Sequence, residues 1–140
     1  MRYHHFAICF ILSASGLVQG QTWEDTRHLA EAQHEIVMLL IEKGEFEKVP
    51  QAANEIFQLS FPEDQERLVL IEVEMLVDAL VHHKQIIVAH KVVDLALGCE
   101  ITAKSKAQLH REKGYLFKME GKAEEALKSF EKSKELEKEG

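Results

Sequence analysis

Cysteine, proline, glycine and aromatic residues are all scarce in this chain, and their scarcity excludes several kinds of protein. Two cysteines cannot build a disulfide framework, and two prolines with seven glycines leave long stretches without a helix breaker. The chain is 46% hydrophobic and 29% charged, which is ordinary for a folded protein and too apolar for a disordered one. Its 140 residues have room for one domain. A single all-α domain is therefore predicted.

Catalytic motifs are also missing from the sequence. It contains no phosphate-binding glycine loop, no Gly-x-Ser-x-Gly nucleophile elbow and no paired-cysteine metal motif. His34-Glu35 is followed by Ile-Val-Met, so the two-histidine motif of metalloproteases is incomplete. We expect neither an enzymatic activity nor a cofactor.

A histidine-based metal site is the one chemical alternative. His82, His83 and His90 lie near one expected helix bend, but zinc needs three or four ligands that converge on it. These histidines flank the bend, so ordinary surface positions account for them more simply. We therefore predict no metal site, and a small metal-binding protein is kept only as the less favoured alternative.

The first twenty residues differ in character from the rest. Arg2 is the only charged residue among them, and an apolar run gives way to small residues, with Val18 and Gly20 where a signal peptidase prefers them. This pattern predicts a signal peptide over residues 1–20, cleaved before Gln21. The protein is then exported, to a periplasm or to the exterior.

Two alternatives to cleavage stay open, an uncleaved membrane anchor and a buried N-terminal helix. The apolar stretch from Phe6 to Val18 is shorter than the ~20 residues that a membrane helix needs. Cys9 lacks the preceding Leu-small-small pattern of a lipoprotein, so no lipid anchor is predicted.

Removal of residues 1–20 leaves 16 basic and 24 acidic residues, a formal charge of −8. Such a surface repels nucleic acid and anionic lipid, and no basic stripe opposes that effect. We expect neither as a partner. Cys99 becomes the only cysteine, so no disulfide can form within the chain, and its apolar neighbours favour burial over a bond between two chains.

Helical periodicity divides the mature chain into six segments with short connections. Residues 21–29 are assigned to an N-terminal segment and residues 30–140 to a helical repeat domain. The third segment is apolar on more than one face, which predicts neighbouring helices on several of its sides. The expected helices run from about residue 29 to 42, 49 to 59, 64 to 83, 85 to 97, 103 to 119, and from 123 towards the C-terminus.

The last two segments resemble a tetratricopeptide repeat. Gly114 matches the small residue that lets the two helices approach, Phe117 the bulky residue three places on, and Gly121 the glycine of the turn. The second helix of the hairpin matches the family's series of alanine, aromatic, small residue and leucine through Ala126, Phe130, Ser133 and Leu136.

Two earlier hairpins match the family more weakly. The first has Gly44 at its turn, and the middle one has Lys84 there. The turns are 40 and 37 residues apart, against 34 in the family, which longer connections between hairpins would absorb. The resemblance implies about three repeats stacked into a right-handed α-solenoid. A generic helical bundle whose last hairpin mimics the motif is the alternative.

The same resemblance implies a binding function. Tetratricopeptide domains bind peptides or proteins in a concave groove lined by the first helix of each hairpin. In the family's best-known groove, lysines and asparagines bind a carboxylate tail. The matching positions of this chain lack those residues and include acidic ones, which favour a neutral or basic partner. The positions of this chain that match the groove are His34, Met38, Glu74, Asp78, Arg111 and Tyr115.

An oligomerising or structural helical protein without such a groove is the main functional alternative. If Ala126, Phe130 and Ser133 left an apolar stripe open on the last helix, a homodimer would cover it.

Overall fold

A computed structural model describes residues 22–140, and the predicted signal peptide over residues 1–20 lies outside this range. The described residues contain helices and turns but no strand, so the prediction of an all-α fold with six helices is confirmed. The helices are α2 (Trp23–Glu42), α3 (Val49–Phe57), α4 (Arg67–His82), α5 (Ile86–Leu97), α6 (Ala103–Met119) and α7 (Ala123–Glu139), with 3-10 turns η1 (Phe46–Lys48) and η2 (Glu63–Gln65).

The first helix begins earlier than the apolar periodicity indicated. The side chain of Thr22 accepts a hydrogen bond from the backbone N–H of Asp25, and the Asp25 carboxylate accepts one from the Thr22 N–H. This capping box satisfies two N–H groups that a helix start leaves without partners. Most of the N-terminal segment assigned to residues 21–29 is therefore the first part of α2.

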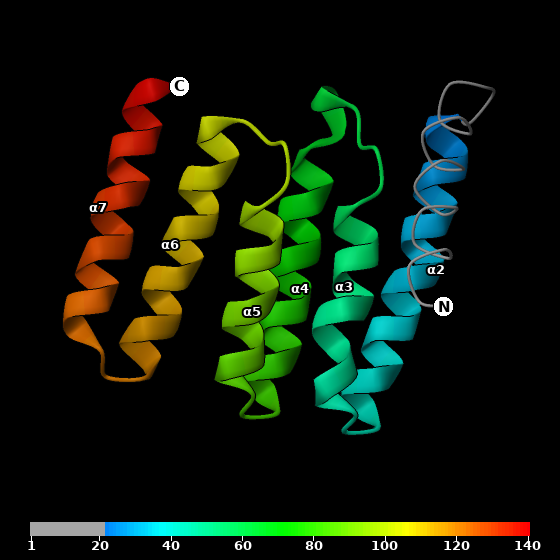
Figure 1. Ribbon diagram of the computed structural model, residues 1–140, viewed down its shortest axis with the longest axis horizontal. Coiled ribbons are helices and arrows are strands. Elements are labelled where there is room, and N and C mark those ends of the chain that lie inside the picture. Colours follow the sequence, from blue (N-terminus) through cyan, green and yellow to red (C-terminus); the bar gives the residue numbers. More distant parts are fainter. Residues whose placement is uncertain (1–21) are drawn as a thin grey trace, which may run out of the picture.

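The six helices stand side by side, with α2 at one end of the row and α7 at the other (Figure 1). Consecutive helices pair as three hairpins, α2 with α3, α4 with α5 and α6 with α7. Between hairpins, α3 packs on α5, α5 on α6, and the first helices contact one another, α2 with α4 and α4 with α6. Helix α4 thus has neighbours on several sides, as its apolar faces predicted.

One cluster of buried apolar side chains extends from α2 to α6. Ile41, Ile56, Leu76, Leu80 and Leu109 are among its members with almost no exposed surface. Burial of each such side chain contributes ~1.5–3 kcal/mol relative to exposure. No residue of α7 belongs to this cluster. Helix α7 is instead attached to α6 through Ala126, Ser129, Ser133 and Leu136.

The three hairpins turn in the same way. Gly44, Lys84 and Gly121 each take a left-handed conformation, with φ of 74°, 59° and 72°. In each turn the N–H of this residue donates to the carbonyl three residues earlier, and the next N–H donates to the carbonyl five residues before it. The middle turn therefore repeats the geometry of the other two without a glycine.

Gly114 allows α7 to lie close against α6. A Cβ at this position would come within 2.7 Å of the Phe130 ring. Ala126 and Ser133 are only 3% and 6% exposed, because α6 covers them. Two of the three residues considered for an open stripe, Ala126 and Ser133, are therefore covered within the chain, and Phe130 is partly buried.

Candidate functional site

An open groove of about 410 Å³ lies between the first helices of the first two hairpins, and we call it the α2–α4 groove. Met75 is 45% exposed in it, and at one end the Trp23 and Phe61 rings pack with their centroids 5.6 Å apart. Accessible apolar surface rimmed by charged groups is characteristic of binding sites. The apolar lining consists of Trp23, Ala30, Ile56, Phe61, Leu68, Ile71 and Met75.

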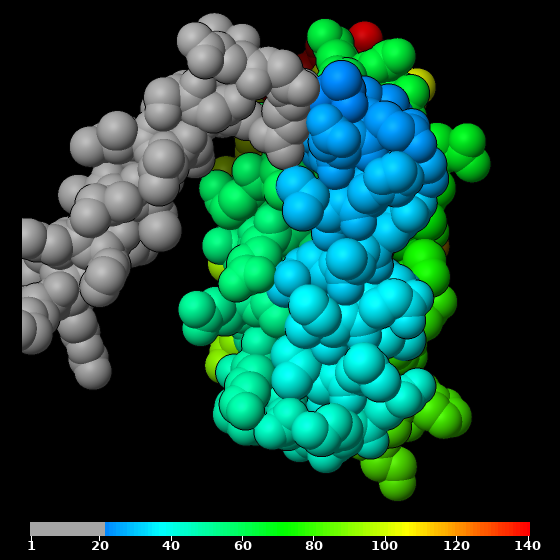
Figure 2. Space-filling view, turned by 90° about the vertical axis from the view of Figure 1, so that its right-hand side faces the viewer, coloured from blue at the N-terminus to red at the C-terminus, as the bar shows by residue number. Residues whose placement is uncertain are grey.

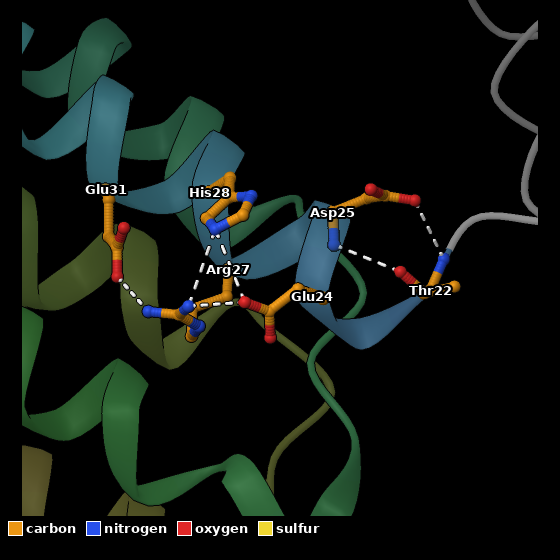
Figure 3. Close-up of polar contacts among 6 residues, drawn as sticks. All are labelled: Thr22, Glu24, Asp25, Arg27, His28 and Glu31. Carbon is orange, nitrogen blue, oxygen red and sulfur yellow. Dashed lines mark hydrogen bonds and ion pairs between the residues drawn. The ribbon is translucent and has the colours of Figure 1, made fainter.

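The rim of the groove along α2 is acidic. Figure 3 shows Arg27 between Glu24 and Glu31, with hydrogen bonds to both carboxylates and with His28 beside them. The hydrogen bond from Arg27 and its charge hold the pKa of Glu24 below its ordinary value. Since Arg27 is already engaged by two acids of its own helix, it adds little positive charge to the groove.

A histidine–carboxylate pair joins the two helices that form the groove. His34 Nδ1 of α2 lies 2.7 Å from Glu72 Oε1 of α4, and the two side chains are only 16% and 14% exposed. Partly buried hydrogen bonds to a charged group are worth ~1.5–3 kcal/mol, more than exposed ones. His34, one of the predicted groove residues, thus lines the groove and also ties α2 to α4.

Carboxylates continue beyond the groove towards α6. Glu74 accepts a hydrogen bond from Gln108 Nε2 of α6 at 3.0 Å. Burial raises the pKa of Glu112 above its ordinary value, and the nearby charges of Glu74 and Asp78 raise it further, against a smaller opposing effect of Arg111. Negative charge is therefore concentrated between α4 and α6, next to the apolar groove.

The other five predicted groove residues make different contacts. Met38 is partly buried against the core, whereas Glu74 and Asp78 lie near Glu112. Arg111 pairs with Glu137 of α7 at 3.4 Å. Tyr115 lies edge-on to the Phe130 ring of α7, with 5.2 Å between centroids. The third hairpin thus directs its two predicted residues towards α7.

Most of the apolar lining was not found from the sequence. The apolar pattern of the third segment predicted neighbouring helices on several of its sides, whereas Met75 of α4 is exposed. Trp23 lay in the segment before the predicted repeat domain. An isolated tryptophan ahead of a helix was the signal that could have identified this end of the groove.

A second hollow, of about 920 Å³, lies among the loops that connect the hairpins. Glu66 lines this hollow, and its carboxylate accepts hydrogen bonds from the N–H and hydroxyl of Thr102, at 2.6 and 2.9 Å. Cys99 Sγ donates to the Phe57 carbonyl at 3.2 Å, and burial raises the pKa of this thiol. These groups satisfy one another and join successive hairpins, and the protonated thiol is a poor nucleophile.

The three histidines considered as metal ligands do not converge. The rings of His82 and His83 lie 5.6 Å apart, whereas His90 bonds to Glu120 and packs on Phe117 at 4.4 Å between ring centroids. Over residues 22–140, no three His, Cys, Asp or Glu side chains form a group that could hold a metal ion.

None of the helices that the structure describes is both long enough and apolar enough to span a bilayer. Comparisons with protein-family models, with curated proteins and with solved structures give no match. Function is therefore argued from the geometry of the chain.

Proposed function

We propose that this chain is an exported, non-enzymatic interaction scaffold that binds a peptide or protein partner in the α2–α4 groove. The observation that carries the proposal is the groove itself, an open apolar surface between the first helices of consecutive hairpins. This is where the tetratricopeptide resemblance expects a ligand to bind.

A right-handed tetratricopeptide-like solenoid is the architecture we propose for the scaffold. Three hairpins with the same turn geometry support it, as do the contacts of first helix with first helix and of α3 with α5. Repeats of this kind bury their apolar faces only against their neighbours, and the stack presents an extended surface for binding.

The charges next to the groove favour a partner that combines an apolar side chain with a basic one. Met75 lies in the groove, and Asp78 follows it by three residues, ~4.5 Å further along α4. A lysine or arginine beside an apolar anchor would reach Asp78 and Glu112. Its positive charge would offset the repulsion among the carboxylates that raises the pKa of Glu112.

Export of the scaffold is proposed from the sequence of residues 1–20, with its single basic residue, apolar run and small residues. The proposed partner is accordingly a peptide or an exposed segment of another exported protein.

The test is a peptide selection. A random peptide library displayed on phage is selected on the immobilised full chain, and the Kd of enriched peptides is measured by fluorescence anisotropy. We expect enriched peptides to pair an apolar residue with lysine or arginine. Met75→Asp should weaken their binding at least tenfold, the effect of losing ~1.4 kcal/mol, and Asp78→Lys should also weaken it.

The matched control is Ile87→Asp. Ile87 is 69% exposed on α5 and does not line the groove, so this variant introduces the same charge elsewhere. It should bind the peptides as the wild type does. If Met75→Asp binds as tightly as Ile87→Asp, or if no peptide is enriched, the proposed groove function is wrong.

A further inference from the structure

The outer face of α2 carries a second apolar surface, separate from the α2–α4 groove. Leu29, Ile36 and Leu39 are 50%, 49% and 55% exposed on it, and Ala32 is exposed between them. Asp25 precedes these four residues and Lys43 follows them. We call this set the α2 stripe, and it consists of Asp25, Leu29, Ala32, Ile36, Leu39 and Lys43.

The spacing of the α2 stripe is that of a coiled coil. Its members follow one another at intervals of 4, 3, 4, 3 and 4 residues. This alternation places side chains on one side of a helix, in the positions through which two helices of a coiled coil pack. It is therefore a surface suited to another helix.

Among the described residues 22–140, the α2 stripe is not used in packing. Val37 and Ile41 are the buried residues of α2, Gln33 donates to the Ala52 carbonyl of α3, and His34 bonds to Glu72 of α4. Those contacts lie on other faces of the helix. Figure 2 looks onto this end of the row, where α2 lies nearest the viewer.

The α2 stripe is complementary to itself when two copies run antiparallel. Leu29 then meets Leu39 of the second copy, and Ala32 meets Ile36 of the second copy. At each end Asp25 lies opposite Lys43, which gives two pairs of opposite charge. A small residue faces a larger one and every contact occurs twice, as a two-fold symmetric interface requires.

We propose that this chain forms a homodimer through the α2 stripe, with the two α2 helices antiparallel. A parallel pair would instead place Asp25 against Asp25 and Lys43 against Lys43, and like charges destabilise such contacts. Both end residues are accessible for pairing. Asp25 uses Oδ2 for the helix cap, and Lys43 is 68% exposed, with its Nζ 3.6 Å from Glu45.

Charged and titratable side chains beside the α2 stripe would also meet in the antiparallel dimer. His28 and Glu42 lie on its outer flank, and the antiparallel dimer brings His28 near Glu42 of the second copy. Glu35 lies on the same flank close to the two-fold axis and faces its own copy. Because this flank stays open to water, that repulsion is weak and is further screened by salt.

The dimer goes beyond the proposed groove function and does not depend on it. No residue of the α2 stripe lines the α2–α4 groove, which adjoins the stripe at Glu35, so each dimer would present two grooves. Two linked sites bind a partner that has two matching segments much more tightly than one site does.

Sedimentation equilibrium of the full chain tests the proposal. We expect the wild type to form a reversible dimer at tens of micromolar, as estimated for a modest helical interface, and Ile36→Glu to dimerise at least tenfold more weakly. The matched control Leu127→Glu, at a residue 59% exposed on α7, should behave as the wild type does. A monomeric wild type, or an Ile36→Glu variant that dimerises normally, would overturn the proposal.

Disulfide cross-linking tests the antiparallel register. Ala32→Cys and Ile36→Cys proteins are mixed and mildly oxidised, with the wild type as the background control for Cys9 and Cys99. Peptide mass spectrometry should find the first variant linked to the second. Links of each variant only to itself, or dimers without any such link, would contradict the antiparallel register.

Discussion

Three residues take the left-handed conformation at the hairpin turns, and only two of them are glycine. Gly44 and Gly121 adopt it without a steric penalty, whereas Lys84 adopts it with a Cβ, at φ of 59°. The hydrogen bonds of the three turns are the same, so the strain at Lys84 is imposed by the packing of the middle hairpin. The sequence alignment of Lys84 with the two glycines correctly identified this turn.

Replacement of Lys84 by glycine should stabilise the protein. Relief of the Cβ contact outweighs the greater chain entropy of glycine in the unfolded state, and we expect the free energy of unfolding to rise by about 0.5–1 kcal/mol. Urea denaturation followed by circular dichroism measures it. Lys84→Ala keeps the Cβ and should show no such gain, and equal effects of the two variants would rule out this explanation.

At the scale of elements, the contact between α4 and α6 brings acidic side chains of both helices together. Glu74 and Asp78 of α4 approach Glu112 of α6, and Gln108 bonds to Glu74 across the same contact. Burial together with these two negative charges raises the pKa of Glu112 above its ordinary value of 4.5. The folded protein therefore holds this proton more tightly than the unfolded chain does.

The consequence is a stability that depends on pH. The contribution of Glu112 to the free energy of unfolding is fully present below the pKa of this group in the unfolded chain. It is lost as the pH rises through the higher pKa that the group has in the folded protein. Glu112→Gln should remove this loss, so that at pH 7 it is more stable than the wild type by about 0.5 kcal/mol, the size of a like-charge contact.

Denaturation at pH 4 and at pH 7 measures the effect, and the difference between Glu112→Gln and the wild type should be larger at pH 7. Glu131→Gln, at an exposed position on α7, is the control and should show little difference at either pH. A Glu112→Gln variant no more stable than the wild type at pH 7 would refute the interpretation of this contact.

At the scale of the whole molecule, the row of helices has a well-packed middle and a weaker end. Helices α4 and α5 are packed by neighbours on both sides, whereas the extensive contacts of α7 are with α6 alone. The buried apolar cluster reaches α6 and stops there. A helix that packs on a single neighbour and lies outside the main apolar cluster opens more readily than one packed on several sides, so α7 is expected to open first.

Hydrogen exchange measured by mass spectrometry should therefore be uneven along the chain. Backbone amides of α4 and α5 are expected to exchange slowest and those of α7 fastest among the six helices. Leu109→Ala removes a core side chain of α6 that is 1% exposed, and we expect it to lower the free energy of unfolding by ~2–5 kcal/mol. The difference in exchange between α7 and helices α4 and α5 should then increase. Protection of α7 equal to that of α4 would contradict this description of the stack.

Much of the fold followed from local sequence. Three local features predicted it: helix-forming residues, the helical spacing of apolar residues, and the turn glycines Gly44 and Gly121. Each acts over only a few residues, so it can be recognised without knowledge of the fold. Helix α6 begins where the sequence placed it, after Thr102, whose side chain accepts a hydrogen bond from the Ser105 N–H. The start of α2 was placed too late, because its capping box is polar and precedes the apolar pattern.

Less of the candidate site was predictable. His34 was expected to line a groove and does so, whereas Arg111 and Tyr115 are engaged by α7, which their own helical spacing does not reveal. The acidic character of the face was foreseen from Glu74 and Asp78. The contribution of Glu112 was not, because it depends on how α6 sits against α4.

The class of the fold and the number of helices depend on neighbours along the chain, so both followed from the sequence. Which apolar faces are covered depends on how the helices pack against one another, and local sequence does not reveal it. Helix α6 buries Ala126 and Ser133, while Leu29 and Ile36 stay exposed at the end of the row. The exposure of a side chain is set by its helix and the neighbouring helices together, and α2 at the end of the row has one face without a neighbour among residues 22–140.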